Sequence, residues 1–209
     1  MAEIRSGILN LLARPWVYDS FQTLVGANAW RERVVREMVS PKLPRGAMVV
    51  DVGCGTGWVL NYLPADVQYA GIDRNPAYIA EARERFAHRA AEFHCEDISG
   101  RKDSFRTGAD VVLAIGLLHH LNDQECGQLV LAAARILKPE GFLLTLDPLY
   151  CDDQSAIARA IIRRDRGRNI RTAGGYRDLL SIGFPRVDVL IERSPLRIPY
   201  TGVVCSARA

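Results

Sequence analysis

Two kinds of hydrophobic pattern alternate along residues 45–147. Short runs rich in β-branched residues are typical of buried strands, and between several of them apolar residues recur every three or four positions, as on one face of a helix. The predicted strands are 48–52, 67–72, 91–95, 109–115 and 142–146, and the predicted helices are about 57–63, 76–88 and 122–137. This alternation favours a parallel sheet with crossover helices.

The pattern changes on both sides of this core. Residues 4–39 look helical, with a break at Pro15, and form a cap on the sheet. The cap either only packs there or closes over a ligand with three residues facing inward: Trp16, Tyr18 and Gln22. After Asp147 we predict helices at 153–164 and 174–182, then strands at 186–192 and 198–207. The link between these last strands is too short for a parallel crossover, so they must pair antiparallel.

Composition and cysteine usage indicate a soluble cytoplasmic protein. The chain is 48% hydrophobic and 24% charged, and its net charge of +3 is too small to imply nucleic acid by itself. Five cysteines occur without a CxxC pair or a Cys/His cluster, which favours reduced thiols and predicts no metal site. No signal peptide is evident, and no apolar run approaches the roughly 20 residues of a transmembrane segment.

The most distinctive stretch is a glycine-rich turn after the first predicted strand. Gly53, Gly55 and Gly57 follow a run of valines. Glycine can adopt positive φ and lets backbone approach a ligand closely, and a loop before a helix offers free N–H groups. Asp51 is discordant, because a carboxylate near the end of an apolar strand is costly unless something partners it.

Asp73 stands at the end of the second predicted strand, twenty residues after Gly53. That spacing places an acceptor where it can bind both hydroxyls of a ribose, although a surface aspartate could also simply cap the next helix. A nicotinamide dinucleotide would want such an acid too. Its G-x-G-x-x-G fingerprint, however, needs glycine where Trp58 stands, which argues against an NAD-dependent oxidoreductase.

Four motifs in this order resemble the class I S-adenosylmethionine-dependent methyltransferases. They are Asp51-Val-Gly-Cys-Gly-Thr-Gly57, Gly71-Ile-Asp73, Glu96-Asp-Ile98 and Leu117-Leu-His-His-Leu121. The resemblance implies an α/β fold with a Rossmann-like, doubly wound, seven-stranded sheet, mostly parallel, with a C-terminal antiparallel hairpin and an N-terminal helical cap. We expect one domain: a cap or lid at 1–44, a cofactor-binding core at 45–147, a substrate-side insertion at 148–183 and the hairpin at 184–209.

The resemblance also assigns cofactor roles. Gly53 and Gly55 would underlie the methionine part of S-adenosylmethionine, with Asp51 near its amino group. Asp73 would hold the ribose hydroxyls. The full expected set, which extends to the adenine and the sulfonium, is Asp51, Gly53, Cys54, Gly55, Asp73, Arg74, Asp97, Ile98, Ile115 and Gly116. The product would be S-adenosylhomocysteine.

Catalysis of methyl transfer depends on the acceptor. Alignment of nucleophile, methyl group and sulfur can supply much of the acceleration, and a hydroxyl acceptor additionally benefits from a general base. His119 is the first base candidate, because it follows the fourth strand and its ordinary pKa suits the role. A purely structural role for His119 and His120 is the alternative. The choice between O-, N- and C-methylation stays open.

The acceptor is expected to be a small molecule or lipid-like. Arginines crowd between Arg159 and Arg171, and arginine forks suit phosphate or carboxylate, which suggests an anionic amphiphile or a phosphate-bearing compound and allows peripheral membrane contact. A solvated basic helix is the alternative. Nucleic acid is not expected, since no aromatics interleave with these arginines. A non-catalytic cofactor-binding partner subunit remains a rival, and the oligomeric state is open.

Overall fold

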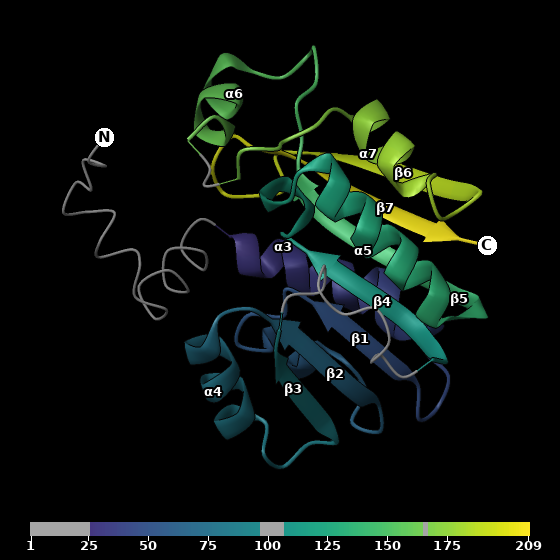
Figure 1. The fold of residues 1–209 in the computed structure, drawn as a ribbon. Coiled ribbons are helices and arrows are strands. Elements are labelled where there is room, and N and C mark those ends of the chain that lie inside the picture. Colours follow the sequence, from purple (N-terminus) through teal and green to yellow (C-terminus); the bar gives the residue numbers. More distant parts are fainter. Residues whose placement is uncertain (1–25, 97–106, 165–166) are drawn as a thin grey trace, which may run out of the picture.

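The computed structural model describes residues 26–96, 107–164 and 167–209. Seven strands form one sheet in the order β3-β2-β1-β4-β5-β7-β6 (Figure 1). All pairings from β3 to β5 are parallel, whereas β7 pairs antiparallel with both β5 and β6. The strands are β1 Met48–Val52, β2 Gln68–Asp73, β3 Ala91–Cys95, β4 Ala109–Ile115, β5 Leu137–Pro148, β6 Arg186–Arg193 and β7 Thr201–Arg208. The predicted fold class is confirmed.

Helices cover both faces of the sheet. On one face lie α3 Ala27–Val34, its π-helical continuation η1 Val35–Val39, the 3-10 helix η3 Trp58–Tyr62 and α4 Pro76–Arg85. On the other face lie α5 Asp123–Ile136 and α7 Ala173–Leu180. The short elements η2 Ser40–Lys42, η5 Leu118–His120 and α6 Ala156–Ile162 complete the described set.

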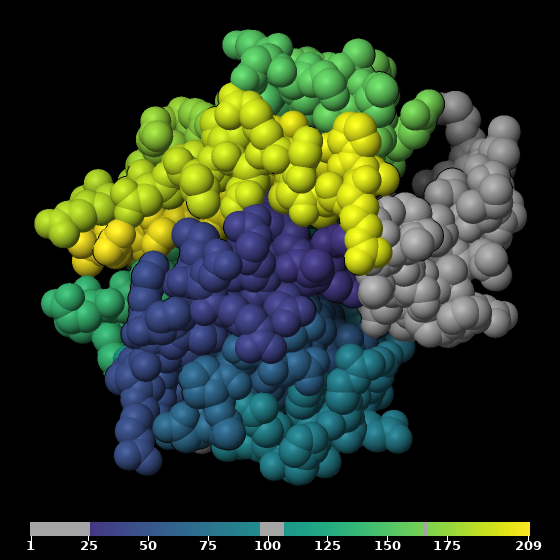
Figure 2. All heavy atoms as spheres, turned by 180° about the vertical axis from the view of Figure 1, so that it is seen from behind, coloured from purple at the N-terminus to yellow at the C-terminus, as the bar shows by residue number. Residues whose placement is uncertain are grey.

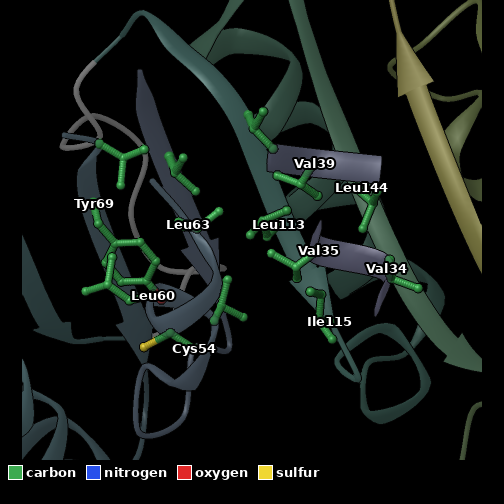
Figure 3. Packing of buried hydrophobic residues seen from close by; sticks show 14 of the residues in the cluster. Val34, Val35, Val39, Cys54, Leu60, Leu63, Tyr69, Leu113, Ile115 and Leu144 are labelled. Atoms are coloured by element: carbon green, nitrogen blue, oxygen red, sulfur yellow. The ribbon is translucent and has the colours of Figure 1, made fainter. Parts of the chain in front are cut away.

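The sheet separates two hydrophobic cores because alternate strand residues point to opposite faces. Val49 and Val111 belong to the core under α3, whereas their neighbours Val50 and Val112 belong to the core under α5. Figure 3 shows valines of α3 and η1 facing β4 and β5: Val34, Val35 and Val39 against Leu113, Ile115 and Leu144. From behind, α3 and η1 (purple) lie between the C-terminal hairpin (yellow) and the blue residues that follow β1 (Figure 2).

Several predicted boundaries differ from the structure. The segment expected as a helix at 57–63 is only a 3-10 helix that ends at Tyr62. Leu63 precedes Pro64, which disfavours helical backbone, and Leu63 is accordingly extended, with a ψ of 151°. Strand β5 begins at Leu137, five residues before its prediction, across a register shift beside Ala109. The helix expected at 153–164 shrinks to α6, since Ser155 caps it by accepting from the N–H of Ala158. The part of the cap before residue 26, with Trp16, Tyr18 and Gln22, lies outside the described residues.

In the described part of the chain, every helix is too short or too polar to span a membrane.

Replacing Gly202 with alanine is expected to lower the free energy of unfolding by about 1–3 kcal/mol, as overpacking of a filled core typically does. Gly202 lies in β7, and a Cβ atom there would come 2.1 Å from Cη2 of the buried Trp30. Urea denaturation measures the change. Gly127→Ala in α5 is the matched control, since its added Cβ would meet only Ile182 at 3.8 Å and alanine favours helix. Equal stability of the two variants would contradict this account of the packing.

Candidate functional site

The carboxyl ends of the parallel strands meet at one edge of the sheet. β1 lies between β2 and β4, so the chain leaves β1 toward one side of the sheet and later returns on the other. Such a switch point opens a crevice beyond the strand ends, where open α/β sheets bind their ligands. The glycine-rich turn directly follows β1 and Gly116 directly follows β4, so both lie at this edge of the sheet.

The glycine-rich turn is held against the end of β2. The N–H groups of Gly53 and Cys54 both donate to the carbonyl of Ile72, at 2.8 and 3.0 Å. Gly53 has a φ of +71°, and a Cβ on it would meet Leu117 at 3.0 Å. Gly55 has a φ of +55°, yet a Cβ on it would meet nothing within 4 Å. The turn therefore needs left-handed backbone, and open space lies beside Gly55.

Asp73 connects this turn to the helix that follows β2. Its Oδ2 accepts a hydrogen bond from the N–H of Gly55 at 3.0 Å, and its Oδ1 accepts one from the N–H of Asn75 at 2.8 Å. Asn75, not Asp73, is the N-cap of α4, since its side chain accepts from the N–H of Ala77. The alternative in which Asp73 caps the helix is therefore wrong. Its carboxylate is half-buried beside the glycine turn, whereas Arg74 is exposed.

Asp51 finds a partner that sequence reasoning missed. It is 1% exposed, and its Oδ2 accepts a hydrogen bond from the Tyr69 hydroxyl of the neighbouring strand at 2.6 Å. Burial raises the pKa of Asp51 to about 7, against an opposing effect of the Tyr69 hydrogen bond and with a further rise from nearby Asp73. The hydroxyl of Tyr69 in β2 thus provides a hydrogen-bond donor for the buried carboxyl of Asp51 in β1. No signal in the apolar run 67–72 distinguished Tyr69 from an ordinary core aromatic.

Of the remaining expected cofactor residues, the structure describes Cys54, Ile115 and Gly116. Cys54 is buried, and burial raises the pKa of its thiol, which keeps it protonated. Ile115 and Gly116 lie at the end of β4 beside β1, where the N–H of Gly116 donates to the carbonyl of Leu146 at 2.6 Å. Asp97 and Ile98 lie outside the described residues.

His119 is buried in the middle of η5 and paired with Asp147. Its Nδ1 lies 2.6 Å from Oδ1 of Asp147, and the same oxygen accepts from the His119 backbone N–H at 3.1 Å. Burial raises the pKa of Asp147, while the bond to His119 opposes that rise. Gly167 packs over the imidazole, because a Cβ there would lie 2.0 Å from its Cδ2. The ring therefore lies under residues 167–169, whereas His120 is exposed.

Comparison with known proteins agrees with this arrangement. A family model described as a methyltransferase domain matches residues 49–141. The chain is similar to trans-aconitate 2-methyltransferase of Variovorax paradoxus, with 31% identity over 176 residues that cover 76% of this chain and 66% of that protein. The chain belongs to the class I S-adenosylmethionine-dependent methyltransferases.

Two further similarities have a narrower reach. A tRNA (carboxymethyluridine(34)-5-O)-methyltransferase of Xenopus tropicalis is 36% identical over 84 residues, which are 40% of this chain and 12% of that protein. The solved structure of the pyocyanin biosynthetic protein PhzM matches with a TM-score of 0.70 and 18% identity, over 95% of this chain and 60% of that one. At that identity the likeness to PhzM concerns the fold alone. The methyltransferase described here thus spans two thirds or less of the length of these proteins.

The arginine-rich stretch of this methyltransferase is in part structural. All five N–H groups of Arg171 donate hydrogen bonds: to the carbonyls of Leu118, Leu121 and Asn169 and twice to Oδ1 of Asp123. This side chain has no donor left for a ligand. Arg159 donates to the carbonyl of Cys151 and lies over the Tyr150 ring. The others that the structure describes are exposed: Arg163, Arg164 and Arg168. Arg166 lies outside the described residues.

Within the described ranges, no three His, Cys, Asp or Glu side chains come together as a metal site.

Proposed function

We propose that this methyltransferase binds S-adenosylmethionine at the β1–β2 edge and transfers its methyl group to a small-molecule acceptor. The observation that carries the proposal is the contact between Asp73 and the glycine turn, 3.0 Å from the Gly55 N–H. It joins a turn of left-handed glycines, open beside Gly55, to a half-buried carboxylate at the end of β2. Such a carboxylate suits a pair of ribose hydroxyls, and the open turn suits the methionine chain.

Each part of the cofactor would contact different residues of the chain. Asp73 accepts from the ribose, Gly53 and Gly55 make room for the methionine chain, and Asp51 faces its amino group. Cys54, Ile115 and Gly116 close the floor, Arg74 lies at the rim, and Asp97 with Ile98 would meet the adenine. When bound, the cofactor supplies a methyl group activated by a positively charged sulfur. The protein contributes alignment and exclusion of water.

The proposed class of acceptor is supported by the name of a relative, and the chemistry of each acceptor decides whether a general base is needed. The Variovorax relative is named for trans-aconitate, a small tricarboxylate, and we propose a small anionic acceptor here, with a lipid or a phosphate-bearing compound as further arms of the test. For a hydroxyl acceptor, His119 would act as general base and Asp147 would stabilise its protonated form. A carboxylate acceptor is already ionised at neutral pH and needs no base, so His119 would then only hold η5 against β5.

A transfer assay tests this function. The protein is incubated with methyl-labelled S-adenosylmethionine and trans-aconitate, other small carboxylates, phosphate esters, lipids or tRNA. We expect label in a small acid, and label only in lipid or tRNA would refute the acceptor class. If the protein binds S-adenosylhomocysteine but labels nothing in any arm, the non-catalytic partner subunit is the better account.

We also propose a cytoplasmic location, supported by the five cysteines, all of which are free thiols.

The affinity for S-adenosylhomocysteine is expected to rise about tenfold between pH 6 and pH 8. Asp51 has a pKa of about 7 in the ligand-free protein, and only its ionised form attracts the ammonium group of the ligand. The contribution of Asp51 to the stability of the fold depends on pH in the opposite direction. Because its pKa lies above the ordinary 3.8, this stabilising contribution is complete below about pH 4 and is lost as the pH rises through 7.

Calorimetric titration at several pH values measures this affinity change. Asp51→Asn is the control, since an amide does not titrate and its profile should be flat. A steep profile in Asp51→Asn would show that another group is responsible.

A further inference from the structure

The helical segment formed by α3 and η1, on one face of the sheet, carries three arginines with different surroundings. Arg33 is paired with Glu192 at 2.8 Å, and Arg36 is paired with Glu32 at 2.8 Å. Arg31 has no carboxylate within ion-pair distance among the described residues. Its Nη1 donates a long hydrogen bond to Oδ1 of Asn28, at 3.4 Å. Of the three, Arg31 alone has no ion-pair partner within the ranges that the structure describes.

Arg31 lies close to the carboxyl ends of the parallel strands. Its Nη2 is 3.5 Å from the position that a Cβ of Gly116 would occupy. Its guanidinium carbon is 5.7 Å from the centroid of the Trp58 ring. Trp58 directly follows the glycine turn, and Gly116 directly follows β4. The guanidinium therefore lies near both the glycine turn and the end of β4, between which the ligand is proposed to bind.

This environment suits recognition of a carboxylate. Arg31 is half-buried, so its charge is only partly hydrated. A guanidinium over an aromatic face is held in orientation by the ring, while its N–H groups point outward in its plane. Those groups can form two parallel hydrogen bonds to a carboxylate, which are stronger than bonds to a neutral acceptor. The lack of a side chain at Gly116 leaves room beside the Nη2 group.

We propose that Arg31 binds a carboxylate of the ligand in this crevice. The inference rests on the proposed function, because that function places a ligand between Trp58 and Gly116. Two carboxylates are available in the reaction: the one on the methionine part of the cofactor and one on an anionic acceptor. Arg171 is not available for this role, since its N–H groups are fully engaged within the fold.

Binding measurements on Arg31→Gln and Arg31→Lys test this, with Arg36→Gln as a control that removes a charge from the same helix outside the site. S-adenosylhomocysteine and 5′-methylthioadenosine, which lacks the amino acid part, are titrated into each protein. trans-Aconitate is titrated into each protein saturated with S-adenosylhomocysteine. Arg31→Lys keeps the charge but loses the fork, so its affinity should fall between the wild type and Arg31→Gln.

The two sources of carboxylate give different results. If Arg31 holds the cofactor, Arg31→Gln weakens S-adenosylhomocysteine binding at least tenfold and leaves methylthioadenosine unchanged. If it holds the acceptor, S-adenosylhomocysteine binding is unchanged and trans-aconitate binding is lost. Unchanged affinity for S-adenosylhomocysteine with no loss of trans-aconitate binding overturns the proposal. A wild type that fails to bind S-adenosylhomocysteine refutes the proposed function instead, and Arg31 is then judged by trans-aconitate without cofactor.

Discussion

Asp73→Ala is expected to lower the affinity for S-adenosylhomocysteine by about 100-fold or more. Hydrogen bonds to a charged group are worth about 1.5–3 kcal/mol each, and the change removes two of them from the ribose hydroxyls. Each 1.4 kcal/mol is about a factor of ten in affinity. The same substitution removes the acceptor of the Gly55 N–H, so the glycine turn loses one of its hydrogen bonds to β2 as well. Isothermal titration calorimetry measures the loss.

Asp73→Asn is the control for the charge of this residue. The amide oxygen keeps one acceptor and can still bind one backbone N–H, so the affinity should fall less than in Asp73→Ala. Both variants should unfold cooperatively, because the cores on the two faces of the sheet are untouched. An Asp73→Ala protein that binds with wild-type affinity would refute the ribose role.

The second large effect concerns stability. Arg171→Met is expected to lower the free energy of unfolding by about 2–4 kcal/mol, since it removes the charged donor that the partly buried carbonyls of Leu118, Leu121 and Asn169 share. The side chain of Arg171 is 11% exposed and joins the segment before α7 to the turn between η5 and α5. The ion pair with Asp123 adds little, because the carboxylate is 82% exposed.

Urea denaturation of Arg171→Met and Arg168→Met separates this role from a general effect of charge. Arg168 lies in the same stretch but is exposed, so its loss should change stability by less than about 0.5 kcal/mol. Equal stability of the two variants would contradict a structural role for Arg171.

Local pattern was enough to predict the parallel half of the sheet. Strands β1, β3 and β4 have the predicted limits, because runs of apolar residues between turn residues leave little choice. β5 was predicted too short, since Pro139 and Gly141 are poor strand formers and join the ladder only through a register shift. That shift depends on pairing with β4, which no local pattern reveals.

The site residues also fall into those that local spacing predicts and those that depend on contacts with distant parts of the chain. The glycine turn and Asp73 were predicted from spacing along one stretch of chain. Tyr69, the partner of Asp51, was missed because a tyrosine in an apolar strand looks like any core residue. The role of Arg171 was missed because its acceptors lie about 50 residues earlier in the chain. Arg31 was missed because, within its helix, it resembles its ion-paired neighbours Arg33 and Arg36.

The central claim is that the glycine turn and Asp73 form a site for S-adenosylmethionine. The most direct measurement is calorimetric titration of the wild-type protein with S-adenosylhomocysteine and, separately, with NAD. The account predicts saturable, equimolar binding of S-adenosylhomocysteine and no binding of NAD at the same concentrations. Binding of NAD without S-adenosylhomocysteine, or no binding of S-adenosylhomocysteine at millimolar concentration, would contradict it.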